Sequence, residues 1–163
     1  MKTLVRTLAA AVMLGAVALA HANDPKATMA DLDARLAKIG VAKIEGTDTV
    51  AGKTVPALFF GSRKINNNFD VVDAVRKERQ ATATVFVKDG DEFVRVSTNV
   101  LTPEGKRGIG TQLARNAAHE ALSKGKPFCG PIDVLGTAFD ACYNPIKEAS
   151  GKVIGVSYVG HKK

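Results

Sequence analysis

The sequence predicts an α+β domain in which helices come first and antiparallel strands dominate the C-terminal half. Three observations predict this class. An apolar stripe with helical spacing lies near the N-terminus, the apolar pattern switches to period two after residue 80, and two hairpin signals follow. Because such a sheet buries an apolar face against helices, we expect one antiparallel sheet with the helices mainly on one side.

The first 22 residues have the features of a secretory signal peptide. Lys2 and Arg6 precede an apolar run over residues 8–20, and residues 20–22 have the Ala-x-Ala form that signal peptidase recognises. The alternative is an uncleaved anchor, but the run is shorter than the roughly 20 residues that span a bilayer. We expect cleavage after Ala22, with cleavage after Ala20 as the alternative. The product would be one periplasmic or secreted domain, residues 23–163, not embedded in the membrane.

The charge pattern argues against nucleic acid as a partner. The net charge is +7, and it falls to about +5 once the two basic residues of the signal are removed. The remaining basic residues are spread along the chain with few aromatic residues between them, unlike a nucleic-acid-binding patch. A mild positive charge of this kind favours the approach of anionic small molecules.

Capping residues and apolar spacing predict the first helix. Asp24 suits its N-cap, Pro25 suits its first position, and Gly40 suits the position that ends it. One apolar stripe runs along it, formed by Met29, Leu32, Leu36 and Ile39.

Weaker signals place the next elements. Residues 54–60 are apolar and β-prone, but Pro56 suits an edge strand better than a central one. A second short helix is predicted after the loop at 66–68, and a third, weaker one over residues 113–124. The apolar side of the second helix consists of Phe69, Val72 and Val75. A last strand is predicted over residues 153–159.

A β-hairpin is predicted between residues 81 and 99, because Asp89-Gly90 separates two alternating runs. With a two-residue turn at 89–90, Val85 would face Val94 on an apolar face of the hairpin. The opposite face would carry Thr82, Thr84, Phe86, Phe93, Arg95 and Ser97.

The mixed composition of that face makes Arg95 a candidate ligand anchor. A solvated face rarely carries two phenylalanines, and a core face rarely carries an unpaired arginine. A half-enclosed pocket explains both, and there Arg95 would bind a carboxylate as a bidentate donor. The alternative is a structural ion pair at the rim of the sheet.

Both cysteines fall within a second predicted hairpin. Residues 127–134 and 137–143 flank a turn at Leu135-Gly136, which makes Cys129 and Cys142 direct cross-strand partners. In an oxidising compartment we expect a disulfide between them. The alternative is two free thiols, because a register shift of one residue would place them on opposite faces.

The glycine-rich segment Gly105–Thr111 superficially resembles a phosphate-binding loop. Its lysine follows the first glycine, which is not the P-loop order, and the dinucleotide-binding spacing of glycines is absent. We interpret it as a mobile loop that brings backbone N–H groups and Arg107 near a pocket. The alternative is an ordinary turn with a solvated arginine.

The sequence offers no catalytic or metal-binding constellation. The predicted mature chain has two histidines, His119 and His161, and neither lies in a recognisable motif. Two cysteines without a nearby histidine do not form a zinc site. We therefore expect a protein that is not an enzyme and that carries no cofactor and no metal.

Several short motifs follow one another in a set order between residues 70 and 160. They are Val85-Phe86-Val87, Phe93-Val94-Arg95-Val96-Ser97-Thr98-Asn99-Val100, Arg107-Gly108-Ile109-Gly110-Thr111, Gly125-Lys126-Pro127-Phe128, Tyr143-Asn144-Pro145-Ile146-Lys147 and Tyr158-Val159-Gly160. Each is weak alone, but the ordered set resembles the single-Cache sensory domains, in particular the Cache 3/Cache 2 fusion type. The resemblance covers about two thirds of the predicted mature chain, residues 23–163.

The resemblance implies a PAS-like antiparallel sheet, with the N-terminal helix packed on one face and a ligand pocket on the other. It also implies an extracytoplasmic domain that binds a small anionic metabolite, often a short carboxylate or an amino acid. The implied ligand-binding residues are Arg95, Arg107, Phe139, Tyr143, Phe128 and Lys147. Relatives often have tyrosine where Phe139 stands, and the two cysteines are not part of the family pattern.

The resemblance also implies a setting in signal transduction. Family members usually lie between two membrane helices of a methyl-accepting chemotaxis receptor or a histidine kinase. Here the chain ends at Lys163, soon after the last strand. We therefore expect a stand-alone binding domain. The alternative is an accessory protein–protein interaction module that docks on a membrane receptor or kinase.

Overall fold

Two antiparallel sheets and three helices make up residues 23–163, the residues that the computed structural model describes. The predicted signal peptide lies outside the described residues. The helices are α1 (Pro25–Ile39), α2 (Asp70–Arg79) and α3 (Ala117–Ser123). The strands are β1 (Ala42–Val50), β2 (Lys53–Phe60), β3 (Arg63–Lys64), β4 (Thr82–Asp89), β5 (Glu92–Thr98), β6 (Phe128–Val134), β7 (Thr137–Lys147) and β8 (Val153–Lys162).

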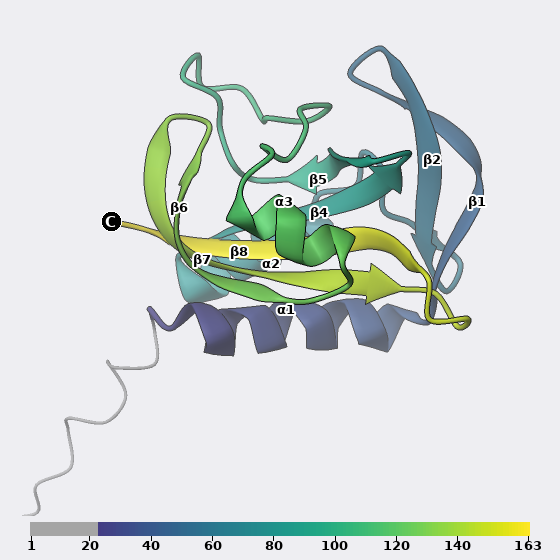
Figure 1. Cartoon of the computed structure of the whole chain (residues 1–163), viewed down its shortest axis with the longest axis horizontal. Coiled ribbons are helices and arrows are strands. Elements are labelled where there is room, and N and C mark those ends of the chain that lie inside the picture. Colours follow the sequence, from purple (N-terminus) through teal and green to yellow (C-terminus); the bar gives the residue numbers. More distant parts are fainter. Residues whose placement is uncertain (1–22) are drawn as a thin grey trace, which may run out of the picture.

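The larger sheet has the strand order β5-β4-β8-β7-β6, and all its neighbouring strands are antiparallel. Helix α1 runs along one side of this sheet, while α3 and the long connection from β5 to β6 lie on the other (Figure 1). The buried apolar residues form two clusters. Helices α1 and α2 and the β1–β2 hairpin contribute to the first, and α3 contributes to the second. The predicted α+β class, with the N-terminal helix on one face, is confirmed, but the expectation of one sheet is wrong, because β1, β2 and β3 form a second one.

Helix α1 forms where its capping residues predict it. The Asp24 side chain accepts a hydrogen bond from the Lys26 N–H at 2.9 Å. Pro25 lacks a backbone N–H, but the N–H at the first helical position would have no acceptor within the helix. At the other end, Gly40 has φ 147° and packs so closely on Gly61 that a Cβ would lie 2.6 Å from its Cα. The predicted stripe faces the sheet, with Met29, Leu32 and Leu36 buried and Ile39 packed beside them.

A polar cluster fastens the middle of α1 to the sheet. The Asp33 carboxylate accepts one hydrogen bond from the Ser157 hydroxyl at 2.8 Å and one from the Asn144 amide at 2.6 Å. Ser157 is fully buried in β8, so its hydroxyl depends on this acceptor. The two bonds fix the position of α1 along β7 and β8, which the apolar contacts alone do not specify.

A histidine fastens the start of α1 to the end of β8. His161 is 8% exposed, and its Nε2 lies 3.0 Å from the Thr28 hydroxyl. Because that hydroxyl donates to the Asp24 carbonyl at 3.0 Å, it accepts from Nε2–H. Burial lowers the pKa of His161 below its ordinary value of 6.5, while the charges of Asp24 and Asp140 oppose this effect.

The second sheet was only partly predicted. The strand expected at residues 54–60 is confirmed as β2, but it is not an edge strand, because it lies between β1 and β3 in a sheet of its own. Strand β1 escaped prediction because Glu45 and Gly46 interrupt its pattern, and the register shifts between Ile44 and Thr47. Pro56 lies opposite the end of this irregularity, where a missing backbone donor costs little.

The predicted register of the β4–β5 hairpin is wrong. The turn lies at Gly90-Asp91, so Phe86 pairs with Arg95 and Val87 with Val94. A register shift then separates Arg95 from Ser97, whose hydroxyl donates instead to the Asn68 carbonyl on the α2 side. Phe86, Phe93 and Arg95 do share one face, as predicted, but Ser97 does not.

The cysteine hairpin has the predicted register. Val134 pairs with Thr137, Cys129 pairs with Cys142, and these cysteines form a disulfide with their Cα atoms 4.1 Å apart. The hairpin carries the edge strand β6, so the disulfide ties that edge to β7. Closing a loop of this length stabilises a fold by about 3 kcal/mol on the chain-entropy account.

The third predicted helix is shorter than expected. Asn116 caps α3 by accepting from the N–H groups of Ala118 and His119, so the helix begins four residues later than the apolar pattern suggested. The preceding residues 110–113 run along β5 instead. The N–H groups of Arg95 and Leu113 donate to the carbonyls of Thr111 and Phe93, both at 2.9 Å. This segment pairs with the outer edge of β5.

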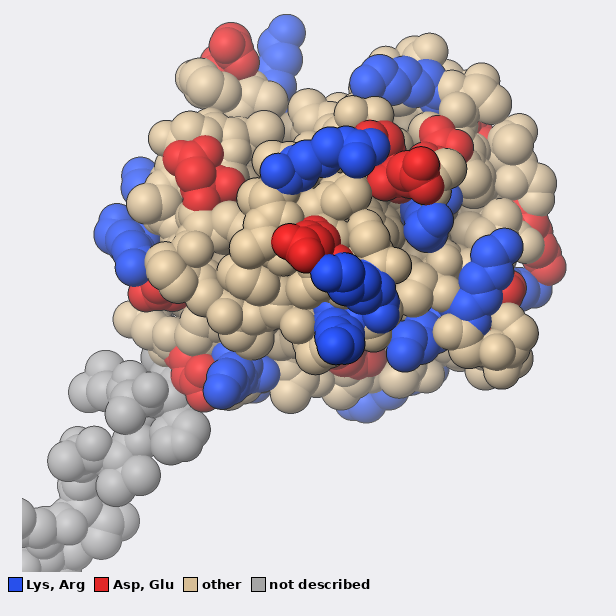
Figure 2. Space-filling model, viewed as in Figure 1, with Lys and Arg blue, Asp and Glu red and all other residues tan. Residues whose placement is uncertain are grey.

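The described surface has mixed charge. Basic and acidic side chains are interspersed on the face shown in Figure 2, without a large patch of one sign. Between residues 23 and 163, no helix combines the length and apolarity that crossing a membrane requires.

Removing the Asp33 carboxylate should destabilise the fold. We expect Asp33→Ala to lower the free energy of unfolding by about 2 kcal/mol, because Ser157 and Asn144 lose a part-buried charged acceptor. Glu45→Ala is the control, since the exposed Glu45–Lys43 pair should contribute less than about 1 kcal/mol. Urea unfolding measures both, and equal effects would contradict the role of Asp33.

The stabilising contribution of His161 should fade in acid. Its folded-state pKa lies below that of the unfolded chain, so the unfolded chain takes up the proton first as the pH falls below 6.5. His161→Gln keeps a donor for Thr28 but does not titrate. Urea unfolding between about pH 7.5 and pH 5 should show the difference in stability between wild type and variant shrinking toward acid. A difference that is constant or grows contradicts this role.

Candidate functional site

Arg95 is buried on the face of the sheet that α3 covers. It is 3% exposed, and its guanidinium carbon lies 4.8 Å from the centre of the Phe86 ring on the neighbouring strand. Its Nη1 donates to the Thr111 hydroxyl at 2.9 Å and to the Gln112 carbonyl at 3.1 Å. Its Nε is buried and has no hydrogen-bond partner in residues 23–163. Arg95 is therefore enclosed but incompletely satisfied.

Arg95 has no carboxylate partner among the described residues, so the predicted alternative of a rim ion pair does not apply to them. Burial lowers the pKa of Arg95 from its ordinary value, as expected for a guanidinium removed from water. An unpaired buried charge is costly, because its desolvation is not offset by an opposite charge. Arg95 is therefore a candidate functional residue.

Two tyrosines lie near this guanidinium. The rings of Tyr143 and Tyr158, on neighbouring strands, have centroids 4.8 Å apart. Burial raises the pKa of Tyr158 to about 12 and that of Tyr143 further, although the charge of Arg95 opposes both shifts. Both hydroxyls are therefore protonated at neutral pH. The Tyr158 hydroxyl lies 3.1 Å from the Thr82 hydroxyl, whereas the Tyr143 hydroxyl makes no hydrogen bond to the described residues.

The six residues that the family resemblance implied do not form one group. Phe128, Phe139 and Tyr143 belong to the apolar cluster on the α3 side, the face on which Arg95 lies against Phe86. The ring centroids of Phe128 and Tyr143 are 6.3 Å apart. Lys147 is exposed at the far end of β7, beside a groove that α1 borders.

Arg107 already has partners on the opposite side of β5. Its two terminal nitrogens each donate to an Asp73 oxygen at 2.8 Å, and Nη1 also donates to the Thr98 carbonyl at 2.8 Å. The guanidinium carbon lies 4.4 Å from the centre of the Phe69 ring. Arg107 thus fastens the glycine-rich segment to α2, and its ligand-binding role stays a prediction.

Sequence reasoning missed two residues of the Arg95 site. Tyr158 stood in a closing motif, but its place opposite Tyr143 follows from the β7–β8 register, which no turn signal specified. Thr111 was assigned to a loop, and its contact with Arg95 arises because residues 110–113 pair with β5. Both depend on long-range pairing rather than on local pattern.

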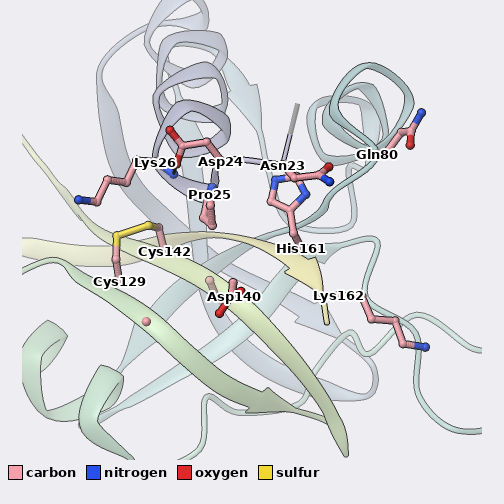
Figure 3. Close-up of a pocket in the computed structure, with 12 residues that line it drawn as sticks. Asn23, Asp24, Pro25, Lys26, Gln80, Cys129, Asp140, Cys142, His161 and Lys162 are labelled. Atoms are coloured by element: carbon pink, nitrogen blue, oxygen red, sulfur yellow. Dashed lines mark hydrogen bonds between the residues drawn. A yellow bond between two sulfur atoms is a disulfide. The ribbon is translucent and has the colours of Figure 1, made fainter. Parts of the chain in front are cut away.

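A separate groove of about 530 Å³ lies where the start of α1, the end of β8 and the cysteine hairpin meet. Figure 3 shows the disulfide on one side of it and His161 on the other, beneath the start of α1. Asp24 and Asp140 line it, as does Lys26. None of the six implied ligand-binding residues lies there, so we call it the disulfide groove and do not assign the ligand to it.

His119 has a structural environment. Its Nε2 lies 3.1 Å from the Asp91 carbonyl, its Nδ1 lies 3.4 Å from the Ser123 hydroxyl, and its ring packs edge-on against Phe93 with centroids 5.5 Å apart. Within the described part of the chain, no group of three or more His, Cys, Asp or Glu side chains is placed to hold a metal ion.

Comparison with known proteins identifies the family. The family model of the Cache 3/Cache 2 fusion domain matches residues 9–163. Among solved structures, the sensor domain of DcuS from E. coli is similar, with 22% sequence identity and a TM-score of 0.41; the match covers 56% of this chain and 63%, less than two thirds, of that one. No curated protein matches the chain. Because the family match spans nearly the whole sequence, the chain belongs to the Cache 3/Cache 2 fusion family of extracytoplasmic sensory domains.

Proposed function

We propose that this protein is a periplasmic or secreted small-molecule-binding domain whose Arg95 anchors the carboxylate of a short organic acid or an amino acid. Membership in a sensory family supports ligand binding. The predicted signal peptide supports export of the domain. The observation that carries the proposal is a buried guanidinium without a counter-ion among residues 23–163.

The geometry of the guanidinium supports a carboxylate. Nη1 is occupied by Thr111 and Gln112, whereas neither Nε nor Nη2 donates to another described residue. These two groups point along one edge of the planar guanidinium, and that edge matches the two oxygens of a carboxylate. A bound carboxylate would supply both the missing acceptors and the missing negative charge.

The surroundings support a small organic ligand. Phe86 offers an aromatic face, and the protonated hydroxyl of Tyr143 is a donor without a described acceptor. The β5–β6 connection covers this face, and its residues Thr111 and Gln112 hold Arg95 directly. A ligand would therefore enter as this cover moves. Ligand binding at Arg95 would in turn change the conformation of the β5–β6 connection.

The proposal is tested by thermal unfolding in the presence of acetate, propionate, pyruvate, succinate and the common amino acids. A ligand at a hundred times its Kd should stabilise the protein by about 2.7 kcal/mol, which raises Tm by several degrees. Arg95→Met should abolish this shift, because it removes the charged donors but keeps an apolar side chain. Arg63→Met, on exposed β3, is the matched control and should leave the shift unchanged.

The stability of Arg95→Met without ligand distinguishes a binding role of Arg95 from a structural one. If Arg95 is kept for a ligand, Arg95→Met without ligand should be within about 1 kcal/mol of wild type or more stable, because a buried unpaired charge is removed. A large loss of ligand-free stability would instead indicate a structural arginine. The absence of a shift with every compound, together with co-purification of a receptor or kinase, would favour the accessory interaction module.

A further inference from the structure

A second concave site lies at the end of the larger sheet where α2 stops. It has a volume of about 480 Å³, within the usual range for small-molecule sites. We call it the Phe139 groove. It lies among Arg76, Gln80, Thr82, Leu101, Phe139 and Lys162, which come from α2, β4, the β5–β6 connection, β7 and β8.

The Phe139 groove has an apolar part, which lies beside polar lining residues such as Gln80, Asn99 and Thr137. Phe139, Val100 and Val134 line it, and all three side chains are buried in the second apolar cluster. Leu101 also lines it but is 45% exposed, which is unusual for a large apolar side chain in residues 23–163. An apolar ligand group placed on Leu101 would remove this area from water, at roughly 25 cal/mol per Å².

The charges that border the groove are all positive. Arg76 and Lys162 are exposed and take part in no ion pair with the described residues, and no acidic residue lines the groove. The disulfide groove differs, because Asp24 and Asp140 line it. Figure 3 shows the Lys162 side chain extending away from the disulfide. The Phe139 groove therefore favours negative ligands more strongly than its neighbour does.

The Phe139 groove is distinct from the Arg95 site. Neither Arg95 nor Tyr143 lines it. The Thr82 hydroxyl, which does line it, lies 3.1 Å from the Tyr158 hydroxyl, and Tyr158 in turn packs on Tyr143. The groove therefore reaches Thr82, whereas Tyr158 and Tyr143 are not among its lining residues.

From its shape and charge, we infer that the Phe139 groove binds an amphipathic organic anion, a medium-chain fatty acid being the simplest form. The carboxylate lies between Arg76 and Lys162, and the alkyl chain lies on Leu101 and Phe139. The site is separate from the proposed carboxylate anchor at Arg95 and takes a larger, more apolar ligand. Further polar groups line it, namely the hydroxyls of Thr82 and Thr137 and the side-chain amides of Gln80 and Asn99.

Isothermal titration with octanoate tests this inference, with octylammonium and acetate as the comparison probes. Octanoate should bind with one site per chain, and octylammonium and acetate should not bind there. The double variant R76Q/K162Q should weaken octanoate binding by about tenfold or more, since two charge contacts are lost. Leu101→Asp should weaken it as well, by placing a negative charge on the apolar wall. All three positions are exposed, so these variants should fold.

The matched control is R63Q/K126Q, which removes the same charge from two other exposed positions and should change the Kd less than about twofold. Equal weakening in both double variants would mean general charge attraction and would overturn the inference. No octanoate binding at millimolar concentration would overturn it too. Loss of binding in Arg95→Met but not in R76Q/K162Q would place octanoate at Arg95. The response to short carboxylates is measured in a separate experiment. The proposal for Arg95 and the inference for the Phe139 groove can therefore fail independently.

Discussion

The fold depends on one constraint, which is that both faces of the five-stranded sheet must be kept from water. Strand β8 is buried along almost its whole length, and β4 is buried through most of its own. Helix α1 covers one face of the sheet, and the hydrogen bonds of Asp33 and His161 hold it there. The other face is covered mostly by the β5–β6 connection and a short helix, α3. The less regular cover is the one that a ligand would have to displace, and it lies over Arg95.

The two arginines that the family resemblance implied show why the same residue type does not imply the same role. Arg107 has a bidentate carboxylate partner, a carbonyl acceptor and an aromatic face, so its donors are largely occupied. Arg95 has two neutral acceptors at one nitrogen and a free edge on the other side. In a low-dielectric setting, an arginine whose donors are unsatisfied gains more by binding an anion than one whose donors are already occupied. The hydrogen-bond partners of the two guanidinium groups therefore distinguish their roles.

Local chemistry in the sequence predicted the elements whose ends are set by single residues. Asp24, Pro25 and Gly40 defined α1, and the Leu135-Gly136 turn defined the cysteine register, since both residues have positive φ there, 52° and 84°. The Asp89-Gly90 signal failed by one position because Gly90 takes the first place of the turn. Strand β1, the bulge before Ser97 and the place of Thr111 beside Arg95 depend on tertiary pairing, which no local pattern carries.

Both outer edges of the larger sheet carry features that hinder strand addition. On one side, the segment at 110–113 occupies the backbone groups of β5 at Phe93 and Arg95. On the other, β6 carries Pro131, which lacks a backbone donor, and the disulfide holds this strand against β7. An open edge would invite two copies to continue one sheet. Contacts that the larger sheet makes with other molecules are thus left mainly to side chains rather than to backbone pairing.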